Sequence, residues 1–285
     1  MSPSAPVPCF FATDLHGSPH RYDALQQAME RERPRAVFLG GDLGPNPWAA
    51  PPGFLEEFFV RRLGELRKRL GPAYPGVFAI LGNDDARSDE PVLREAESRG
   101  NLVYVHGRSA PLDAYTVYGY AFVPPTPFTF KDWERYDVSR YVPPGSVSPE
   151  EGVHGDPGRA RASRDRTIAK DLAALAGDVD LARAVFLFHT PPHETNLDRA
   201  GLDGRMVDHV PLDLHVGSIA VRRFLEDREP WLSLHGHVHE SARIMGSWRD
   251  RIGRTECLGG AHDGPELALV RFDLNRPVHA VRELL

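Results

Sequence analysis

The sequence predicts an α/β fold in which two β-sheets pack face to face and helices cover their outer sides. Early in the chain, short apolar runs alternate with helix-like patterns, and after about residue 242 strand-like runs follow one another between turns. A length of 285 residues fits one large domain about as well as two small ones. We predict a single domain over residues 1–285, with a loop-rich insertion or lid at about 124–165.

The strands are predicted from short apolar runs. The run at 36–39 contains no polar residue, which is typical of a strand buried on both faces. The other runs of the alternating part are 9–13, 77–81, 102–105, 116–122, 184–188 and 231–234. The runs of the last part are 256–258, 267–272 and 278–281.

The helices are predicted from the spacing of apolar residues and from capping residues. Ser18 followed by Pro19 is typical of an N-cap and a first helical position. The clearest helix covers 54–70, where leucine and phenylalanine form one stripe and charged residues lie elsewhere. Further helices are expected at 91–100, 167–176 and 218–227.

Residues 124–165 form a different kind of segment, rich in proline and glycine and without sustained periodicity. A segment of this length is typical of a lid or substrate loop, or of a surface insertion without a role, and both interpretations stay open. Arg159 and Arg161 lie in a short arginine-rich stretch and are candidates for binding a substrate phosphate through paired N–H groups. Asp156, Asp165 and Asp171 are interspersed with the arginines of this part of the chain, which favours a solvated helix start.

The composition is typical of an ordinary soluble protein, with 41% hydrophobic and 26% charged residues. A formal net charge of −6 argues against a protein that coats nucleic acid, because no global positive field would attract a polyanion. It does not exclude a phosphate substrate, because bound divalent cations reverse the local charge.

The first residues lack the basic and apolar segments of a signal peptide, and no run approaches the roughly 20 apolar residues that span a bilayer. We therefore expect a cytoplasmic protein without membrane contact. Cys9 and Cys257 both lie in apolar, strand-like contexts, so we expect two buried free thiols and no disulfide.

Five short blocks of metal-ligand residues each follow an apolar run. In an open α/β sheet the carboxyl ends of the strands are where ligands bind, so these blocks are expected to meet. Imidazole, carboxylate and amide groups without a thiol suit manganese, iron, zinc, cobalt or nickel better than calcium. Any one block alone is usually a turn or a loop, but five together predict a metal site. The blocks are Asp14-Leu15-His16, Gly40-Gly41-Asp42, Gly82-Asn83-Asp84-Asp85, His189 and Gly236-His237-Val238-His239.

The order of these blocks resembles the calcineurin-like metallophosphoesterases, whose blocks read D-x-H, GD, GN, H and GHxH. The resemblance implies hydrolysis of a phosphate ester with two divalent ions, manganese being the first choice. It implies that Asp42 bridges the ions, one of which is held by Asp14, His16 and His239 and the other by Asn83, His189 and His237. Two such metal ions turn a bound water into hydroxide at neutral pH and hold the phosphoryl group in position for attack.

The third block departs from the family pattern. Most members carry a histidine where this chain has Asp84, and that histidine is thought to protonate the leaving oxygen or to steady the phosphate. An aspartate is normally ionised at neutral pH, so it can act as an acid only if its pKa is raised. We therefore predict a preference for esters with good leaving groups, such as aryl phosphodiesters. His193, ahead of His20 and His262, is the best substitute acid, although a surface-loop position is equally compatible with its sequence context.

The leading interpretation is a metal-dependent phosphodiesterase that hydrolyses a small phosphate ester or nucleotide, with Asn83 also contacting the substrate. A nuclease or a protein phosphatase would keep the chemistry and change the substrate, but the sequence has no basic stripe to bind nucleic acid. A third interpretation is a non-catalytic or weakly active metal-binding interaction module of the same fold. Loss of several ligands would mark such a module, and here every ligand position is filled.

Overall fold

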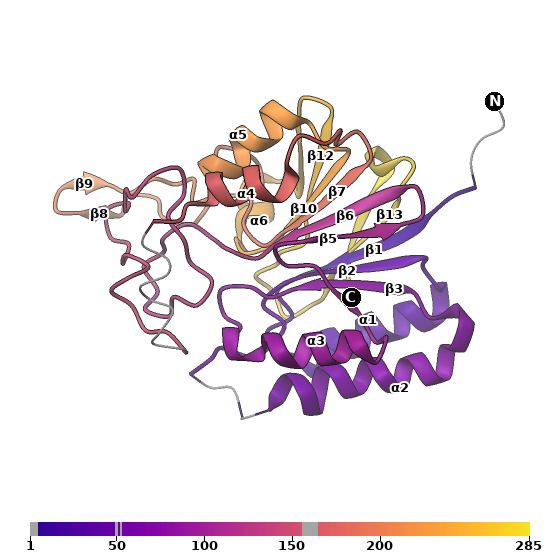
Figure 1. Cartoon of the computed structure of the whole chain (residues 1–285). Coiled ribbons are helices and arrows are strands. Elements are labelled where there is room, and N and C mark those ends of the chain that lie inside the picture. Colours follow the sequence, from indigo (N-terminus) through magenta and orange to yellow (C-terminus); the bar gives the residue numbers. More distant parts are fainter. Residues whose placement is uncertain (1–4, 49–50, 52, 156–164) are drawn as a thin grey trace.

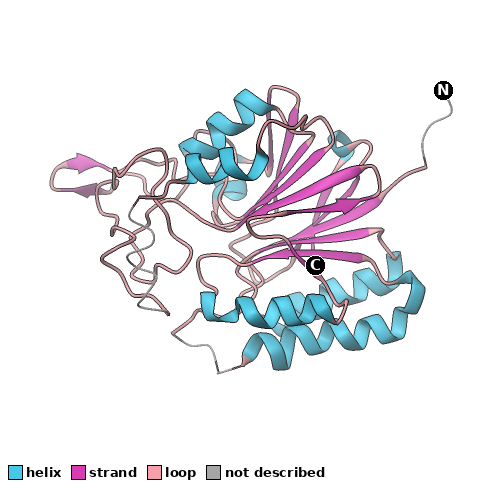
Figure 2. Ribbon diagram, viewed as in Figure 1, coloured by secondary structure: helices cyan, strands magenta, loops and turns pink. Residues whose placement is uncertain are grey.

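Two six-stranded sheets lie face to face, and helices cover the outer side of each, as the computed structural model shows (Figures 1 and 2). The structure describes residues 5–48, 51, 53–155 and 165–285. The arrangement confirms the fold class predicted from the alternation of apolar runs and helix patterns. Across the interface between the sheets, β2 (Ala36–Gly40) faces β7 (Ala184–Phe188), and both strands are buried along their whole length.

The first sheet has the strand order β14-β13-β1-β2-β3-β4. Strands β1 to β4 run parallel, and β13 pairs antiparallel with both β1 and β14. The rings of Phe38 and Phe78 stack on its surface with centroids 5.5 Å apart. Its other strands are β1 (Pro8–Ala12), β3 (Gly76–Ile80), β4 (Val103–Tyr104), β13 (Ala268–Asp273) and β14 (Val281–Leu284).

The second sheet has the order β11-β12-β10-β7-β6-β5, with a parallel centre and an antiparallel strand at each edge. Its other strands are β5 (Ser109–Leu112), β6 (Tyr115–Tyr120), β10 (Leu232–His235), β11 (Arg249–Ile252) and β12 (Thr255–Gly259). A separate short hairpin is formed by β8 (Met206–Val207) and β9 (Val210–Pro211).

The helices cover the two outer faces. Helices α1 (Pro19–Glu32), α2 (Arg61–Leu70) and α3 (Glu90–Ser98) lie on the first sheet, and α4 (Ile168–Ala176) and α5 (Ile219–Arg228) lie on the second (Figure 1). A short helix, α6 (Ser241–Met245), follows β10. The predicted N-cap Ser18 is confirmed, because it accepts from the backbone N of Arg21 at 3.4 Å. Ser218 caps α5 in the same way and accepts from the backbone N of Val221 at 3.0 Å.

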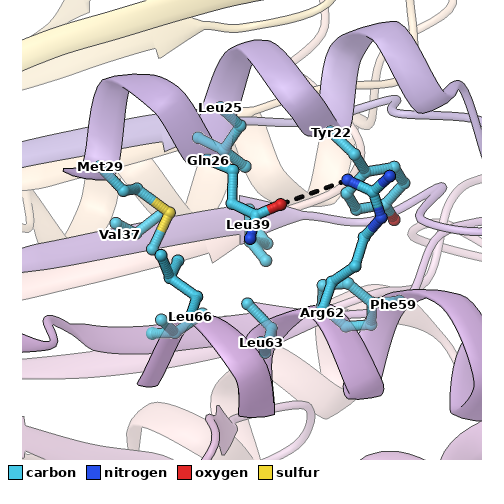
Figure 3. Close-up of a pocket in the computed structure, with 11 residues that line it drawn as sticks. Tyr22, Leu25, Gln26, Met29, Val37, Leu39, Phe59, Arg62, Leu63 and Leu66 are labelled. Atoms are coloured by element: carbon cyan, nitrogen blue, oxygen red, sulfur yellow. Dashed lines mark hydrogen bonds between the residues drawn. The ribbon is translucent and has the colours of Figure 1, made fainter. Parts of the chain in front are cut away.

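The interface between α1, α2 and β2 encloses a cavity of only about 20 Å³ (Figure 3). Apolar side chains surround it, among them Met29, Leu39 and Leu66. A hydrogen bond of 3.2 Å from Arg62 Nη1 to Gln26 Oε1 lies beside it. The cavity is therefore a packing gap in the core between helix and sheet, and we assign it no function.

Two predicted elements differ in the structure. The predicted helix at 54–70 begins as π-helix over Leu55–Val60 and becomes α-helical only in α2, and in the π-helical part Phe58 stacks on Phe54 with ring centroids 4.8 Å apart. The strand predicted at 278–281 lies later in the chain, at Val281–Leu284. Pro277 begins a short 3₁₀ turn over Pro277–His279, because proline fixes φ and cannot donate to a ladder, and the strand starts only at Val281.

The described part of the predicted insertion contains isolated bridges but no regular helix or extended strand. Polar contacts fix it to the start of α5 and to the segment after β3. Asp137 accepts from Ser218 Oγ at 2.5 Å and from the backbone N of Ile219 at 2.7 Å, so it caps α5. Asp132 accepts from the backbone N of Arg87 at 2.8 Å. Arg159 and Arg161 lie outside the described residues.

Both cysteines are buried and unpaired, as predicted. Within the described ranges, no helix has the length and the apolar character needed to cross a membrane.

Candidate metal centre

Every predicted metal-ligand residue follows a parallel strand at its carboxyl end. Asp14 and His16 follow β1, and Asp42 follows β2. The remaining positions are Asn83 after β3, His189 after β7, and His237 and His239 after β10. The two sheets thus contribute loops to one site, which is the position expected for a ligand site in an α/β fold.

The first group consists of Asp14, His16, Asp42 and His239, and one ligand atom from each lies within 4.8 Å of the others. The His16 and His239 Nε2 atoms are 3.1 Å apart. His239 Nε2 is 3.4 Å from Asp14 Oδ1, and His16 Nε2 is 3.8 Å from Asp42 Oδ2. Two imidazole nitrogens and two carboxylates therefore converge on one point.

The second group lies on the other side of Asp42. His189 Nε2 is 3.4 Å from Asp42 Oδ2 and 2.9 Å from Asn83 Oδ1. The rings of His189 and His237 have centroids 5.2 Å apart. Asp42 Oδ2 therefore faces both His16 and His189, which is the position that the bridging role requires.

Four of the ligand positions have a left-handed backbone, with φ of 54° at Asp14, 47° at His16, 50° at Asp42 and 74° at His237. This conformation costs a non-glycine residue about 1–3 kcal/mol and is concentrated at functional sites. Backbone hydrogen bonds hold it. His16 N donates to Asp42 O at 2.8 Å, and His237 N donates to the Asp14 carboxylate at 3.1 and 3.2 Å. The strain therefore lies in the residues that would hold the ions.

Two glycines let the loops approach one another. A β-carbon at Gly82 would lie 2.5 Å from Asp42 N and 2.6 Å from His189 Cε1. A β-carbon at Gly236 would lie 2.7 Å from Asp14 Oδ2. Such separations are inside van der Waals contact, so only glycine fits at either position.

Further polar contacts orient the ligands. His189 Nδ1 donates to Gly40 O at 2.8 Å, which leaves Nε2 free for an ion. The buried Asp85 carboxylate accepts the backbone N–H groups of Leu43, Gly44 and Gly82 at 3.1, 2.7 and 2.9 Å. Asp85 thus joins the loop after β2 to the loop after β3, a role that the sequence did not indicate.

Asp84, which stands where the family has a histidine, lies beside His16. Asp84 Oδ2 is 3.7 Å from His16 Nδ1, which is within ion-pair range but too long for a hydrogen bond. Burial, followed by the nearby Asp42 carboxylate, raises the pKa of Asp84 to about 6. Divalent ions bound beside Asp84 would shift its pKa in the opposite direction, because positive charge favours the ionised carboxylate.

The three histidines considered as substitute acids are not among the residues that line the pocket over the ligand cluster. His193 Nε2 is 3.2 Å from Asp213 Oδ2, and His262 Nε2 is 3.1 Å from Glu266 Oε2. The structure therefore gives His193 a carboxylate partner outside the pocket, and its catalytic role stays a prediction without support from a contact.

The ligand cluster opens into a pocket of about 400 Å³. Sequence reasoning missed several residues that line it, because they lie in loops without regular spacing. The sequence signals were the position of Asn46 and Trp48 shortly after the second ligand block and the interpretation of 124–165 as a lid or substrate loop. The other lining residues that were missed are Phe128, Thr129, Phe130 and Glu240.

The donor set fits divalent cations. Acceptor atoms at the separations given above repel one another unless a proton or a cation lies between them. Buried carboxylates and imidazoles that face one another are the usual ligands of transition metals, and orienting contacts such as that of His189 with Gly40 accompany such sites. The structure therefore supports a metal-binding group of aspartate and histidine residues.

We predict that ion uptake at His189 releases a proton. Burial alone would lower the pKa of His189, but the Asp42 carboxylate outweighs it and raises the pKa to about 10. A metal-ligating imidazole must lose this proton, so affinity should rise about tenfold per pH unit below that value. Burial, together with His189, lowers the pKa of His237 to about 3, so His237 should release none.

Manganese titration by calorimetry between about pH 6 and 8, in two buffers of different ionisation enthalpy, counts the released protons. At least about one proton should leave as both ions bind. An affinity that does not change with pH over this range would contradict the prediction.

No family model matches the chain, and no curated protein matches its sequence. One solved crystal structure is 15% identical with a TM-score of 0.62, and that of TT1561 from Thermus thermophilus is 16% identical with a TM-score of 0.58. Each alignment covers 98% of this chain and 99% of the other chain. A structure described as a novel archaeal phosphodiesterase aligns over the same shares at 8% identity, with a TM-score of 0.43.

At these identities the first two structures show the fold alone, a mixed α/β architecture with two large sheets flanked by helices. The third likeness is too weak to carry an argument about activity. The evidence for a function is therefore the order of the ligand blocks and the geometry of the residues in them.

Proposed function

We propose that this chain is a metal-dependent phosphoesterase of the calcineurin-like type, and that it acts as a phosphodiesterase on a small phosphate ester or nucleotide. The observation that carries the proposal is the position of Asp42. Its Oδ2 atom lies 3.8 Å from His16 Nε2 and 3.4 Å from His189 Nε2, between two groups of ligand side chains. A carboxylate supports this role because it offers two oxygens and a negative charge between two cations.

Divalent ions in this site would acidify a water and neutralise the charge that develops on the phosphoryl oxygens. The residues of the chain hold and orient the reactants. Asn83 lines the pocket and is fixed by His189, so it can also contact a phosphoryl oxygen. Asp84 lines the same pocket, where burial raises its pKa and bound divalent ions would lower it, so we propose it only as a candidate acid for the leaving oxygen.

The alternatives predict different surroundings of the site. The described residues that line the pocket include no lysine or arginine, which argues against a nuclease or another enzyme of polyanionic substrates. An interaction module of the same fold would need no complete ligand set, whereas here each position of both groups is filled. Asp84 is the one departure that points toward low activity.

Elemental analysis after manganese loading, followed by hydrolysis assays, tests the proposal. We expect about two ions per chain and faster hydrolysis of bis(para-nitrophenyl) phosphate than of para-nitrophenyl phosphate. Asp113→Asn is a matched control, because Asp113 is exposed and pairs with Arg35 Nη2 at 2.7 Å away from the ligand blocks. Bound manganese without turnover of either ester would favour the interaction module, and a failure to bind any transition metal would refute both interpretations.

A further inference from the structure

Three aromatic rings, which we call the aromatic wall, line the pocket beside the ligand cluster. They are Trp48, Phe128 and Phe130, and they come from two segments far apart in the chain, the loop after β2 and the predicted insertion. Trp48 is 63% exposed and Phe128 is 58% exposed, while Phe130 is buried. The rings of Trp48 and Phe130 meet edge to face with centroids 5.9 Å apart. Large exposed rings that gather at a pocket mark a surface that binds something.

The wall is held in place by polar contacts. Trp48 N donates to Asn46 Oδ1 at 3.1 Å. Phe128 N donates to Thr126 Oγ1 at 3.1 Å, and Thr126 in turn donates to the buried carboxylate of Glu134. These bonds fix the backbone that carries the rings, so less conformational entropy is lost when a ligand binds.

A buried ion pair lies beneath this part of the wall. Lys131 Nζ is 2.5 Å from Glu134 Oε2, and it also donates to Thr126 O at 2.9 Å. The side chains of Lys131 and Glu134 are almost wholly inaccessible to solvent. Breaking a buried pair leaves an uncompensated charge, so this pair resists movement of the segment that carries Phe128.

The charges around the pocket limit what the wall can bind. Asp84 and Glu240 line it, and Glu240 Oε1 is fixed by the backbone N of Gly201 at 2.9 Å. As noted above, the described lining contributes no lysine or arginine. Within the described lining, a second phosphate on the substrate would meet carboxylates and no fixed positive side chain. The arrangement therefore favours a singly charged ester with an uncharged ring.

We propose that the aromatic wall binds the planar ring of the group that stays on phosphorus in a singly charged phosphodiester, an aryl group or a nucleobase. This inference rests on the proposed function and names its substrate class. The ring stacks on Trp48 and Phe128 while the phosphoryl group lies at the ligand cluster. Stacking on an exposed aromatic side chain should raise kcat/KM about tenfold for an ester that carries the ring.

Three diesters with the same para-nitrophenyl leaving group test the proposal, because they differ only in the group that stays on phosphorus. That group is methyl, phenyl or the nucleoside thymidine. We expect the wild type to hydrolyse the phenyl or the thymidine diester about tenfold faster than the methyl diester, in kcat/KM. A preference for phenyl would identify an aryl ester, and a preference for thymidine would identify a nucleobase.

Substitutions of the wall should change this ratio. Trp48→Ala should remove most of the preference for the ring, and Trp48→Phe should keep most of it. Tyr141→Ala is the matched control, because Tyr141 is an exposed aromatic residue of the same insertion that does not line the pocket. A Trp48→Ala variant with the wild-type ratio would overturn the inference.

A binding measurement keeps the test independent of turnover. A singly charged monoester of nitrobenzylphosphonate carries its ring through a P–C bond and should quench tryptophan fluorescence in the wild type, with the Trp48 contribution lost in Trp48→Phe. Hydrolysis of all three diesters at equal rates would refute ring binding by the aromatic wall and would still support the proposed function. Ring-dependent quenching without hydrolysis of any diester would refute the proposed function and would still support ring binding by the aromatic wall.

Discussion

Asp42→Asn is expected to lower kcat on bis(para-nitrophenyl) phosphate by about a thousandfold or more and to remove at least one of the two bound ions. Asparagine keeps the shape of the side chain and one oxygen, but it loses the charge and the second carboxylate oxygen. Two divalent metal ions at this site would contribute several kcal/mol to stabilising the transition state. At 1.36 kcal/mol for each factor of ten, loss of that contribution gives the expected effect.

Elemental analysis and initial rates on the same preparation measure both effects. Asp113→Asn, with the same chemical change at an exposed position, should match the wild type in both. An Asp42→Asn enzyme that keeps two ions and turns over within about tenfold of the wild type would show that Asp42 does not bridge them.

The sequence predicted the central strands of both sheets because buried strands leave a continuous apolar signal. The run at 184–188 coincides with β7, which is buried at every position. The edge strands of the second sheet left no such signal. The strand β11 has the sequence RDRI and keeps only Ile252 buried, and β5 has the sequence SAPL, so neither shows an apolar pattern. Edge strands are defined by the neighbour they pair with, and a single sequence does not specify that neighbour.

The ligand blocks were predictable because each follows a strand whose position was predictable. The groups around them were not, because they depend on contacts between distant parts of the chain. Phe128 is brought to the pocket by the insertion, and Glu240 by the loop that follows the last ligand block. The position of Asp84 beside His16 likewise depends on how the loops after β1 and β3 meet.

Gly82→Ala tests whether close approach of the loops, and not only the identity of the ligands, makes the site. The added β-carbon would lie 2.5 Å from Asp42 N and 2.6 Å from His189 Cε1, and still closer to Asp42 Oδ1. Rotation of a side chain cannot relieve a clash with a backbone nitrogen, so the loop after β2 must move. A misplacement of about 1 Å costs about a hundredfold in rate, and overpacking costs about 1–3 kcal/mol of stability.

Gly64→Ala separates this effect from the general effect of adding a methyl group to a glycine. Gly64 lies within α2, where a β-carbon would lie 3.6 Å from its nearest neighbour, Asn101 Nδ2. Alanine is favoured over glycine inside a helix by up to about 1 kcal/mol, so this variant should keep both ions and unfold at an equal or higher temperature. Gly82→Ala should unfold at a lower temperature, bind fewer ions and lose about a hundredfold in kcat. If Gly82→Ala instead bound two ions with wild-type turnover, the loops would have room that this structure does not show, and the closely packed two-ion site would be wrong.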